Sequence, residues 1–183
     1  MRRLTALIAT TMLILPPALF GHAQDTTHVY AVAKYTKANN PLLKMAQEKG
    51  TVGIIPYHVE NGKTYILLGQ ELTGGKREAS GTFSDLGGSI KPDGQTILQH
   101  ALREFTEESM GQMRLSEADV LKNGYLLFKK SAKNRPIYYI LVKFSDKQYA
   151  KTKKFHCATV RLKASSVPNC YLEKEMFMWM QLD

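Results

Sequence analysis

Two runs of apolar and β-branched residues form the clearest strand pattern in the chain. Residues 51–59 (TVGIIPYHV) and 64–68 (TYILL) both favour strands. The connection between them contains Asn61-Gly62, a pair that readily adopts the positive φ angles of a tight turn. We therefore expect an antiparallel hairpin. Because Pro56 has no N–H to donate, it predicts that the first strand is an edge strand or has a bulge.

The clearest helical pattern follows a loop, residues 70–82, and a strand-like segment, residues 83–90. The turn sequence KPDG leads into Thr96 and Gln99, which have the spacing of a capping box. We expect the helix to end near Gly111. The apolar residues after the cap recur at helical spacing and predict one buried face: Ile97, Leu98, Ala101, Leu102 and Phe105.

The second half of the chain predicts mainly strands. Residues 124–130 (GYLLFKK) and 137–144 (IYYILVKF) have the composition of strands. Strands before and after one well-capped helix predict a single α/β or α+β domain with a mixed sheet. Four further segments are expected to be an added strand or ordered arm (25–40), a short helical turn (116–122), another strand (159–163) and a last apolar segment (175–182).

The N-terminus has the pattern of a secretory signal peptide. Two arginines are followed by an almost uncharged apolar run, residues 4–20, and then by Gly21-His22-Ala23. We expect cleavage after Ala23 and export of the mature chain, secreted or periplasmic, rather than an uncleaved anchor, because Pro16-Pro17 would break a spanning helix. The predicted organisation is a signal peptide at 1–23, an N-terminal arm at 24–50 and a domain at 51–183.

Composition adds a basic charge to this picture. The chain of 183 residues has 25 Lys and Arg against 16 Asp and Glu, which gives +9, and +7 once two arginines leave with the signal peptide. This balance favours anionic partners without choosing among them. The basic residues between 147 and 163 predict a solvated face or a docking surface for an anionic polymer or membrane. Cys157 and Cys170 either pair in an oxidising compartment or are two separately buried thiols.

Three acidic residues of the predicted helix carry the candidate chemistry. Glu104, Glu107 and Glu108 are spaced so that their side chains converge on one side of the helix, where they repel one another. A divalent cation such as Mg²⁺ or Mn²⁺ would remove that repulsion. The alternative is a solvated acidic face in which Arg103 pairs with Glu107. The glycine pair Gly87-Gly88 lets backbone approach a ligand and favours a metal–phosphate site.

Two segments of this region resemble the Nudix box of the Nudix hydrolases. The family pattern is Gly, five residues, Glu, seven residues, then Arg-Glu-apolar-any-Glu-Glu-any-Gly. Residues 103–108 (REFTEE) match their part of it completely, and their spacing from Gln95 is correct. Three positions depart from the pattern: one extra residue follows Gly88, Gln95 replaces the first glutamate, and Met110 precedes the closing Gly111. The resemblance extends over most of residues 51–182, but only the box is specific.

The resemblance implies a fold, a reaction and a set of site residues. The fold would be a Nudix-like α/β/α sandwich with a mixed sheet and one catalytic helix. The reaction would be hydrolysis of a nucleoside diphosphate linked to another group, by water attack on phosphorus with Mg²⁺ or Mn²⁺. Glu104, Glu107 and Glu108 would hold the metal with the Gly87 carbonyl, and Arg103 would orient a box glutamate. The general base would be a box glutamate, Glu173 or Glu175.

Two functions follow from these observations. The first is an exported pyrophosphohydrolase acting on a nucleotide-type small molecule, without integral membrane association once the signal peptide is removed. The second is a catalytically weak or inert Nudix-fold module that binds a nucleotide or an anionic surface. The intact acidic set favours the enzyme, and Gln95 favours the module. No sequence motif supports a nucleic-acid partner, and neither the particular substrate nor the oligomeric state is predicted.

Overall fold

A computed structural model describes residues 30–33, 40–71, 81–153 and 174–182 of the chain. Several predicted features fall on residues outside these ranges: the signal peptide, the two cysteines, the strand at 159–163 and Glu173. The domain boundaries also stay predictions.

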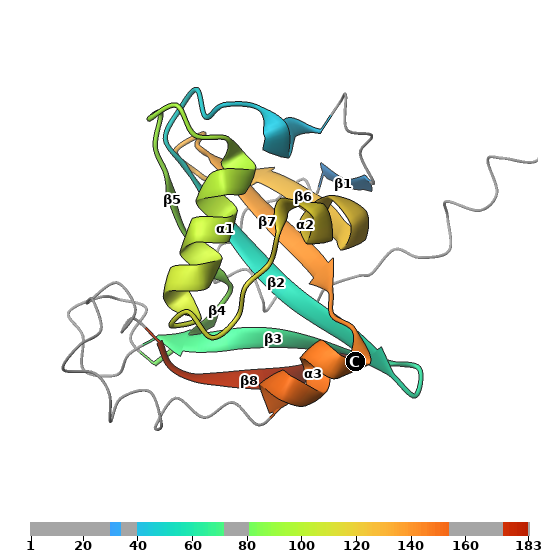
Figure 1. The fold of residues 1–183 in the computed structure, drawn as a ribbon. Coiled ribbons are helices and arrows are strands. Elements are labelled where there is room, and N and C mark those ends of the chain that lie inside the picture. Colours follow the sequence, from blue (N-terminus) through green and yellow to red (C-terminus); the bar gives the residue numbers. More distant parts are fainter. Residues whose placement is uncertain (1–29, 34–39, 72–80, 154–173, 183) are drawn as a thin grey trace, which may run out of the picture.

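A mixed sheet forms the centre of the molecule (Figure 1). Among the described residues it has eight strands. β2 and β7 run parallel, and the other pairs are antiparallel, as the prediction of a mixed sheet requires. The strand order is β1 (Tyr30–Ala33), β6 (Gly124–Lys130), β7 (Pro136–Lys143), β2 (Gly50–Glu60), β3 (Lys63–Glu71) and β4 (Phe83–Ser84), with β5 (Leu86–Ile90) on β2 and β8 (Lys174–Leu182) on β3.

Three α-helices accompany the sheet in the described part of the chain: α1 (Ile97–Glu108), α2 (Glu117–Asn123) and α3 (Asp146–Lys153), with a 3₁₀ turn at Pro41–Leu43. The predicted capping box of α1 is confirmed. Thr96 Oγ1 accepts a hydrogen bond from the Gln99 N–H at 3.1 Å, and Gln99 Oε1 accepts one from the Thr96 N–H at 2.9 Å. The helix ends at Glu108, and Gly111 follows with a φ of 69°. α2 confirms the short helical turn that was predicted.

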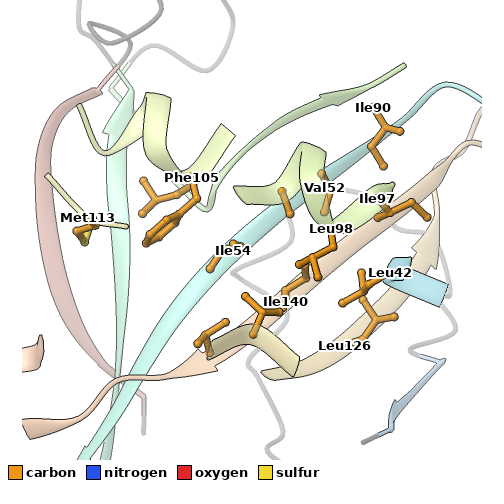
Figure 2. Close-up of a cluster of buried hydrophobic side chains, with 14 of the residues drawn as sticks. Leu42, Val52, Ile54, Ile90, Ile97, Leu98, Phe105, Met113, Leu126 and Ile140 are labelled. Carbon is orange, nitrogen blue, oxygen red and sulfur yellow. The ribbon is translucent and has the colours of Figure 1, made fainter. Parts of the chain in front are cut away.

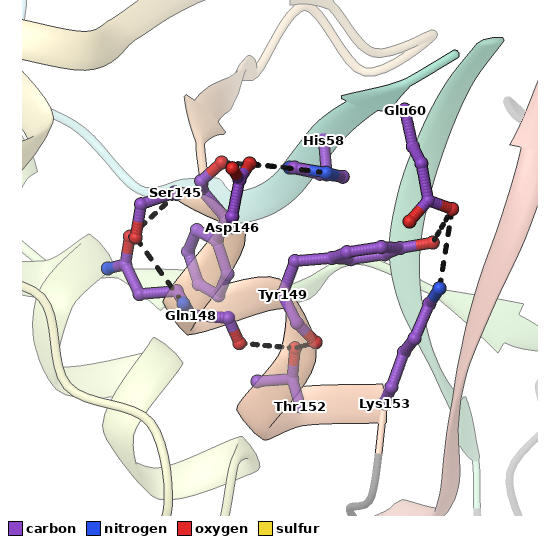
Figure 3. A network of polar contacts seen from close by, with 9 residues as sticks. His58, Glu60, Ser145, Asp146, Gln148, Tyr149, Thr152 and Lys153 are labelled. Atoms are coloured by element: carbon purple, nitrogen blue, oxygen red, sulfur yellow. Dashed lines mark hydrogen bonds and ion pairs between the residues drawn. The ribbon is translucent and has the colours of Figure 1, made fainter.

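The sequence analysis did not predict α3. Of its residues, Tyr149 and Thr152 are buried, so its sequence carries no apolar periodicity from which a helix could be read. Figure 3 shows how polar contacts hold it to β2. His58 Nδ1 donates to the Phe144 carbonyl at 3.1 Å, and its ring stacks on Tyr149 with the centroids 4.0 Å apart. This cluster therefore docks the helix on the sheet.

The main core lies between α1 and the sheet (Figure 2). Leu98, Ala101 and Phe105 of α1 are completely buried, as the helical periodicity predicted. They pack in one cluster with residues of β2 and β7, among them Ile54 and Ile140. The packing fixes the rotation of α1 about its axis, and with it the direction of the polar face.

The prediction for Pro56 was wrong. β2 is an interior strand, with β7 along one side and β5 and β3 along the other. β5 pairs with β2 as far as Ile54, and the register with β3 begins at Tyr57. Pro56 lies in the gap between these two partners, so its missing N–H removes no hydrogen bond from that side. The Asn61-Gly62 hairpin is confirmed, with φ angles of 53° and 76°.

None of the described helices is long and apolar enough to cross a bilayer.

Candidate active site

The polar face of α1 lies against the glycine pair of β5. A Cβ atom added to Gly88 would come 2.3 Å from Glu104 Oε2, and one added to Gly87 would come 2.3 Å from the Gly53 Cα. Side chains at these positions would therefore push Glu104 or β2 away. The absence of side chains at Gly87 and Gly88 lets the helix carboxylates approach the strand backbone.

Arg103 pairs with two of the three predicted metal ligands. Its guanidinium lies 2.5 Å from Glu104 Oε1 and 2.8 Å from Glu107 Oε2. Partial burial opposes the charged form of Arg103, but the two carboxylates outweigh it and raise its pKa. The pairing with Glu107 is the one expected of an acidic face without metal. It also matches the orienting role implied by the family resemblance.

Glu108 lies deeper and has different partners. Its side chain is 7 % exposed, against 15 % for Glu104 and 23 % for Glu107. Its Oε2 accepts a hydrogen bond from the Gly87 N–H at 2.9 Å and lies 3.2 Å from Lys174 Nζ. Burial raises the pKa of Glu108 to about 8, although Lys174 and the Gly87 N–H both favour the ionised form. Glu108 thus belongs to a buried cluster rather than to the partly exposed pair of Glu104 and Glu107.

Lys174 is the residue that the sequence analysis missed. Its side chain is fully buried, and its ammonium donates to Glu71 Oε1 and, at 2.6 Å, to Ser84 Oγ. Burial also raises the pKa of Asp85, and the charge of Lys174 opposes that shift. A lysine next to an apolar run gave no sign that it would turn inward. The cluster consequently surrounds one ammonium with several acidic groups.

The fit of a divalent ion differs among the three glutamates. Within the described ranges, no three Asp, Glu, His or Cys side chains gather into a group that could hold a metal ion. Mg²⁺ often binds through one or two carboxylates together with substrate phosphates and water. Glu104 and Glu107, joined by Arg103 and partly exposed, suit that arrangement. Glu108 does not suit metal binding in its present position, because its Oε2 already contacts the Lys174 ammonium and accepts a hydrogen bond from the Gly87 N–H.

Gln95 and Glu175 are the remaining candidates among the described residues. Gln95 stands before the N-cap of α1, where its N–H donates to Asp93 Oδ1 at 3.1 Å. Glu175 lies in β8, within the irregular start of the strand. The structure assigns neither of them a chemical role.

A basic cavity lies at the far end of β5 from Gly87. It has a volume of about 410 Å³, and its lining includes Lys49, Lys91 and Arg135. Hydroxyl groups of Thr51, Ser89 and Ser131 add hydrogen-bonding capacity. The charge and the donors suit an anionic group such as a phosphate or carboxylate.

Several solved structures are similar to this chain. A Caenorhabditis elegans Ap4A hydrolase binary complex is 19 % identical, with a TM-score of 0.42 over 73 % of this chain and 80 % of that one. The Nudix domain of Shewanella oneidensis NrtR with ADP-ribose is 17 % identical (TM-score 0.36, 61 % and 72 % covered). A Nudix hydrolase from Nitrosomonas europaea is also 17 % identical (TM-score 0.34, 69 % and 93 % covered).

The chain is similar in fold to Nudix hydrolases. No family model and no curated protein matches it. At these identities the likeness concerns the fold alone, so the functional argument rests on the residues of α1, β5 and β8.

Proposed function

We propose that this protein is a Nudix-type pyrophosphohydrolase that cleaves a nucleoside diphosphate linked to another group. The observation that carries the proposal is the placement of Glu104 and Glu107, adjacent on the accessible side of α1 and joined by Arg103. The backbone of Gly87 and Gly88 runs beside that helix. The N-terminal pattern of residues 1–23 supports export as part of the same proposal.

Each side chain of the site would have its own role in the reaction. Glu104 and Glu107 would hold a Mg²⁺ or Mn²⁺ ion. When bound, that ion would neutralise the pyrophosphate and lower the pKa of a water molecule. Arg103 keeps the two carboxylates oriented, and Gly88 leaves space for Glu104 against β5. The family resemblance also implies metal ligation by the Gly87 carbonyl and by Glu108, whose Oε2 accepts a hydrogen bond from the Gly87 N–H. Lys49, Lys91 and Arg135 would bind an anionic part of the substrate.

A second candidate is a Nudix-fold module that binds a nucleotide without turning it over. The observation that favours it is that Arg103 and Lys174 already contact the box glutamates. Gln95 in place of the first box glutamate points the same way.

Hydrolysis assays distinguish the two candidates. ADP-ribose, a dinucleoside tetraphosphate and other nucleoside diphosphate derivatives would be offered with Mg²⁺, with Mn²⁺ and with a chelator. We expect metal-dependent release from at least one compound. We expect Glu104→Gln and Glu107→Gln each to lower its rate by roughly a hundredfold or more, as is typical when a charge-stabilising group is removed.

Two further variants sharpen this test. Gly88→Ala displaces the flexible end of Glu104, so we expect a loss of hydrolysis in a chain that still folds. Glu117→Gln changes an exposed acid of α2 and should leave the rate unchanged. If the folded wild-type protein binds a compound of the panel but releases nothing from any of them, the non-catalytic module is the correct function.

A further inference from the structure

The ammonium of Lys174 is held by three oxygen atoms from three elements. Glu71 comes from the end of β3, Ser84 from β4 and Glu108 from the last turn of α1. A lysine ammonium has three N–H donors, so these three acceptors use all of them. The Ser84 hydroxyl in turn donates to Glu71 Oε1 at 2.7 Å, which links two of the acceptors. Lys174 is therefore fixed in position.

The fold contains two features that admit this side chain. In the pairing of β3 with β8, Gln70 lies opposite Met176 but Glu71 lies opposite Lys174, so β8 contains one extra residue at Glu175. Such a bulge reverses the alternation of side chains and turns Lys174 toward α1. Gly69 leaves room for its stem, because a Cβ there would come 2.9 Å from Lys174 Cδ. The buried position of the lysine is thus specific to this local geometry.

We propose that the Lys174 ammonium takes the place of a divalent ion at Glu108. The site would then bind divalent metal through Glu104 and Glu107 alone. This inference deepens the proposed function and rests on it only for the metal at Glu104 and Glu107. The exclusion of metal from Glu108 follows from the contacts of Lys174 itself.

The geometry gives a physical reason for the exclusion. A metal ion at Glu108 Oε2 would stand within a few ångströms of a buried ammonium, where two like charges repel strongly. Lys174 cannot move aside without giving up its contacts with Glu71 and Ser84. The lysine and a divalent ion are therefore alternative occupants of this position.

Counting bound Mn²⁺ by electron paramagnetic resonance, without nucleotide, tests the proposal independently of hydrolysis. We expect Lys174→Met to bind one more Mn²⁺ per chain than the wild type, because Glu71 and Glu108 lose their cation. The double variant Lys174→Met/Glu108→Gln should lose that extra ion. Lys153→Met, which removes the exposed Lys153–Glu60 pair, is the matched control and should leave the count unchanged.

A second comparison does not depend on the folding of the Lys174 variant. In the wild-type background, Glu108→Gln should leave the number of bound Mn²⁺ ions unchanged and their affinity within about twofold. Glu107→Gln should weaken the binding of Mn²⁺. An equal count in a folded Lys174→Met variant, or a loss of Mn²⁺ in Glu108→Gln, would overturn the proposal. Failure of the proposed function would look different: the wild type would bind no Mn²⁺ and hydrolyse nothing, and Lys174→Met would still gain an ion.

Discussion

At the scale of single residues, the box glutamates differ in their surroundings although they share one helix. Glu104 and Glu107 contact a partly exposed arginine, and Glu108 contacts a buried lysine and a backbone N–H. Desolvation acts on a carboxylate in proportion to its burial and favours the neutral form. Burial therefore couples proton uptake by Glu108 to folding in the neutral range.

This coupling predicts how stability depends on pH. The pKa of Glu108 rises to about 8 in the folded protein from an ordinary value of 4.5. Between these values the folded state holds the proton that the unfolded chain releases, so the free energy of unfolding falls as pH rises. The raised pKa of Asp85 acts in the same direction. Urea unfolding at pH 5 and pH 8, without metal, should show lower stability at pH 8.

The variant Glu108→Gln, which cannot titrate, should show a smaller decrease between the two pH values. Glu117→Gln, at an exposed position of α2, should show the same decrease as the wild type. An identical pH dependence in the wild type and Glu108→Gln would contradict the assignment to Glu108.

At the scale of elements, α1 is positioned by its cap at one end and by its core face along its length. The capping box satisfies N–H groups that the first turn leaves without partners. Glu104, on the polar face of α1, lies against Gly88 of β5. The cap and the core face together therefore hold the helix that carries Glu104 and Glu107.

Removal of the cap gives a prediction for α1. Thr96→Ala should lower the free energy of unfolding by about 1 kcal/mol, the usual effect of losing an N-cap side chain. Thr96→Ser keeps the hydroxyl that accepts from the Gln99 N–H and should retain most of the stability. Chemical denaturation of the two variants and the wild type measures the difference. Equal losses in both variants would show that the methyl group, not the cap, is responsible.

At the scale of the whole molecule, the fold gathers three of the basic residues around one cavity. Lys49, Lys91 and Arg135 come from separate segments, and the sheet brings them around one cavity beside β5. Several cations around a concavity attract an anionic ligand more strongly than isolated surface lysines do. This arrangement supports the cavity as the binding site for an anionic part of the substrate.

The cavity gives a prediction for binding. The double variant Lys91→Ala/Arg135→Ala should raise KM by roughly three- to tenfold, because two long-range attractions are lost, and should change kcat little. The increase in KM should shrink as salt rises, since salt screens exposed charges. Lys63→Ala/Lys151→Ala removes the same charge at exposed positions away from the cavity and is the matched control. An equal rise of KM in both double variants would assign the effect to net charge.

Much of the local structure could be predicted from the sequence. The hairpin at Asn61-Gly62, the cap of α1 and its buried face all follow from short-range spacing. α3 could not be predicted, because few of its residues are buried. Pro56 was misjudged, because the gap between its neighbouring strands arises only when β5 and β3 pair with β2.

The sequence by itself thus determined which residues share a strand, a turn or a helix face, since backbone geometry sets those relations within a few residues. Only the tertiary structure decided the partners of those faces. The bulge in β8 turns Lys174 toward Glu108, whereas simple alternation along the strand groups it with the exposed Met176 and Met178. The physical reason is that register and packing depend on the whole sheet. The extra residue in β8 reverses the direction of the Lys174 side chain and so brings its ammonium to the Glu108 carboxylate.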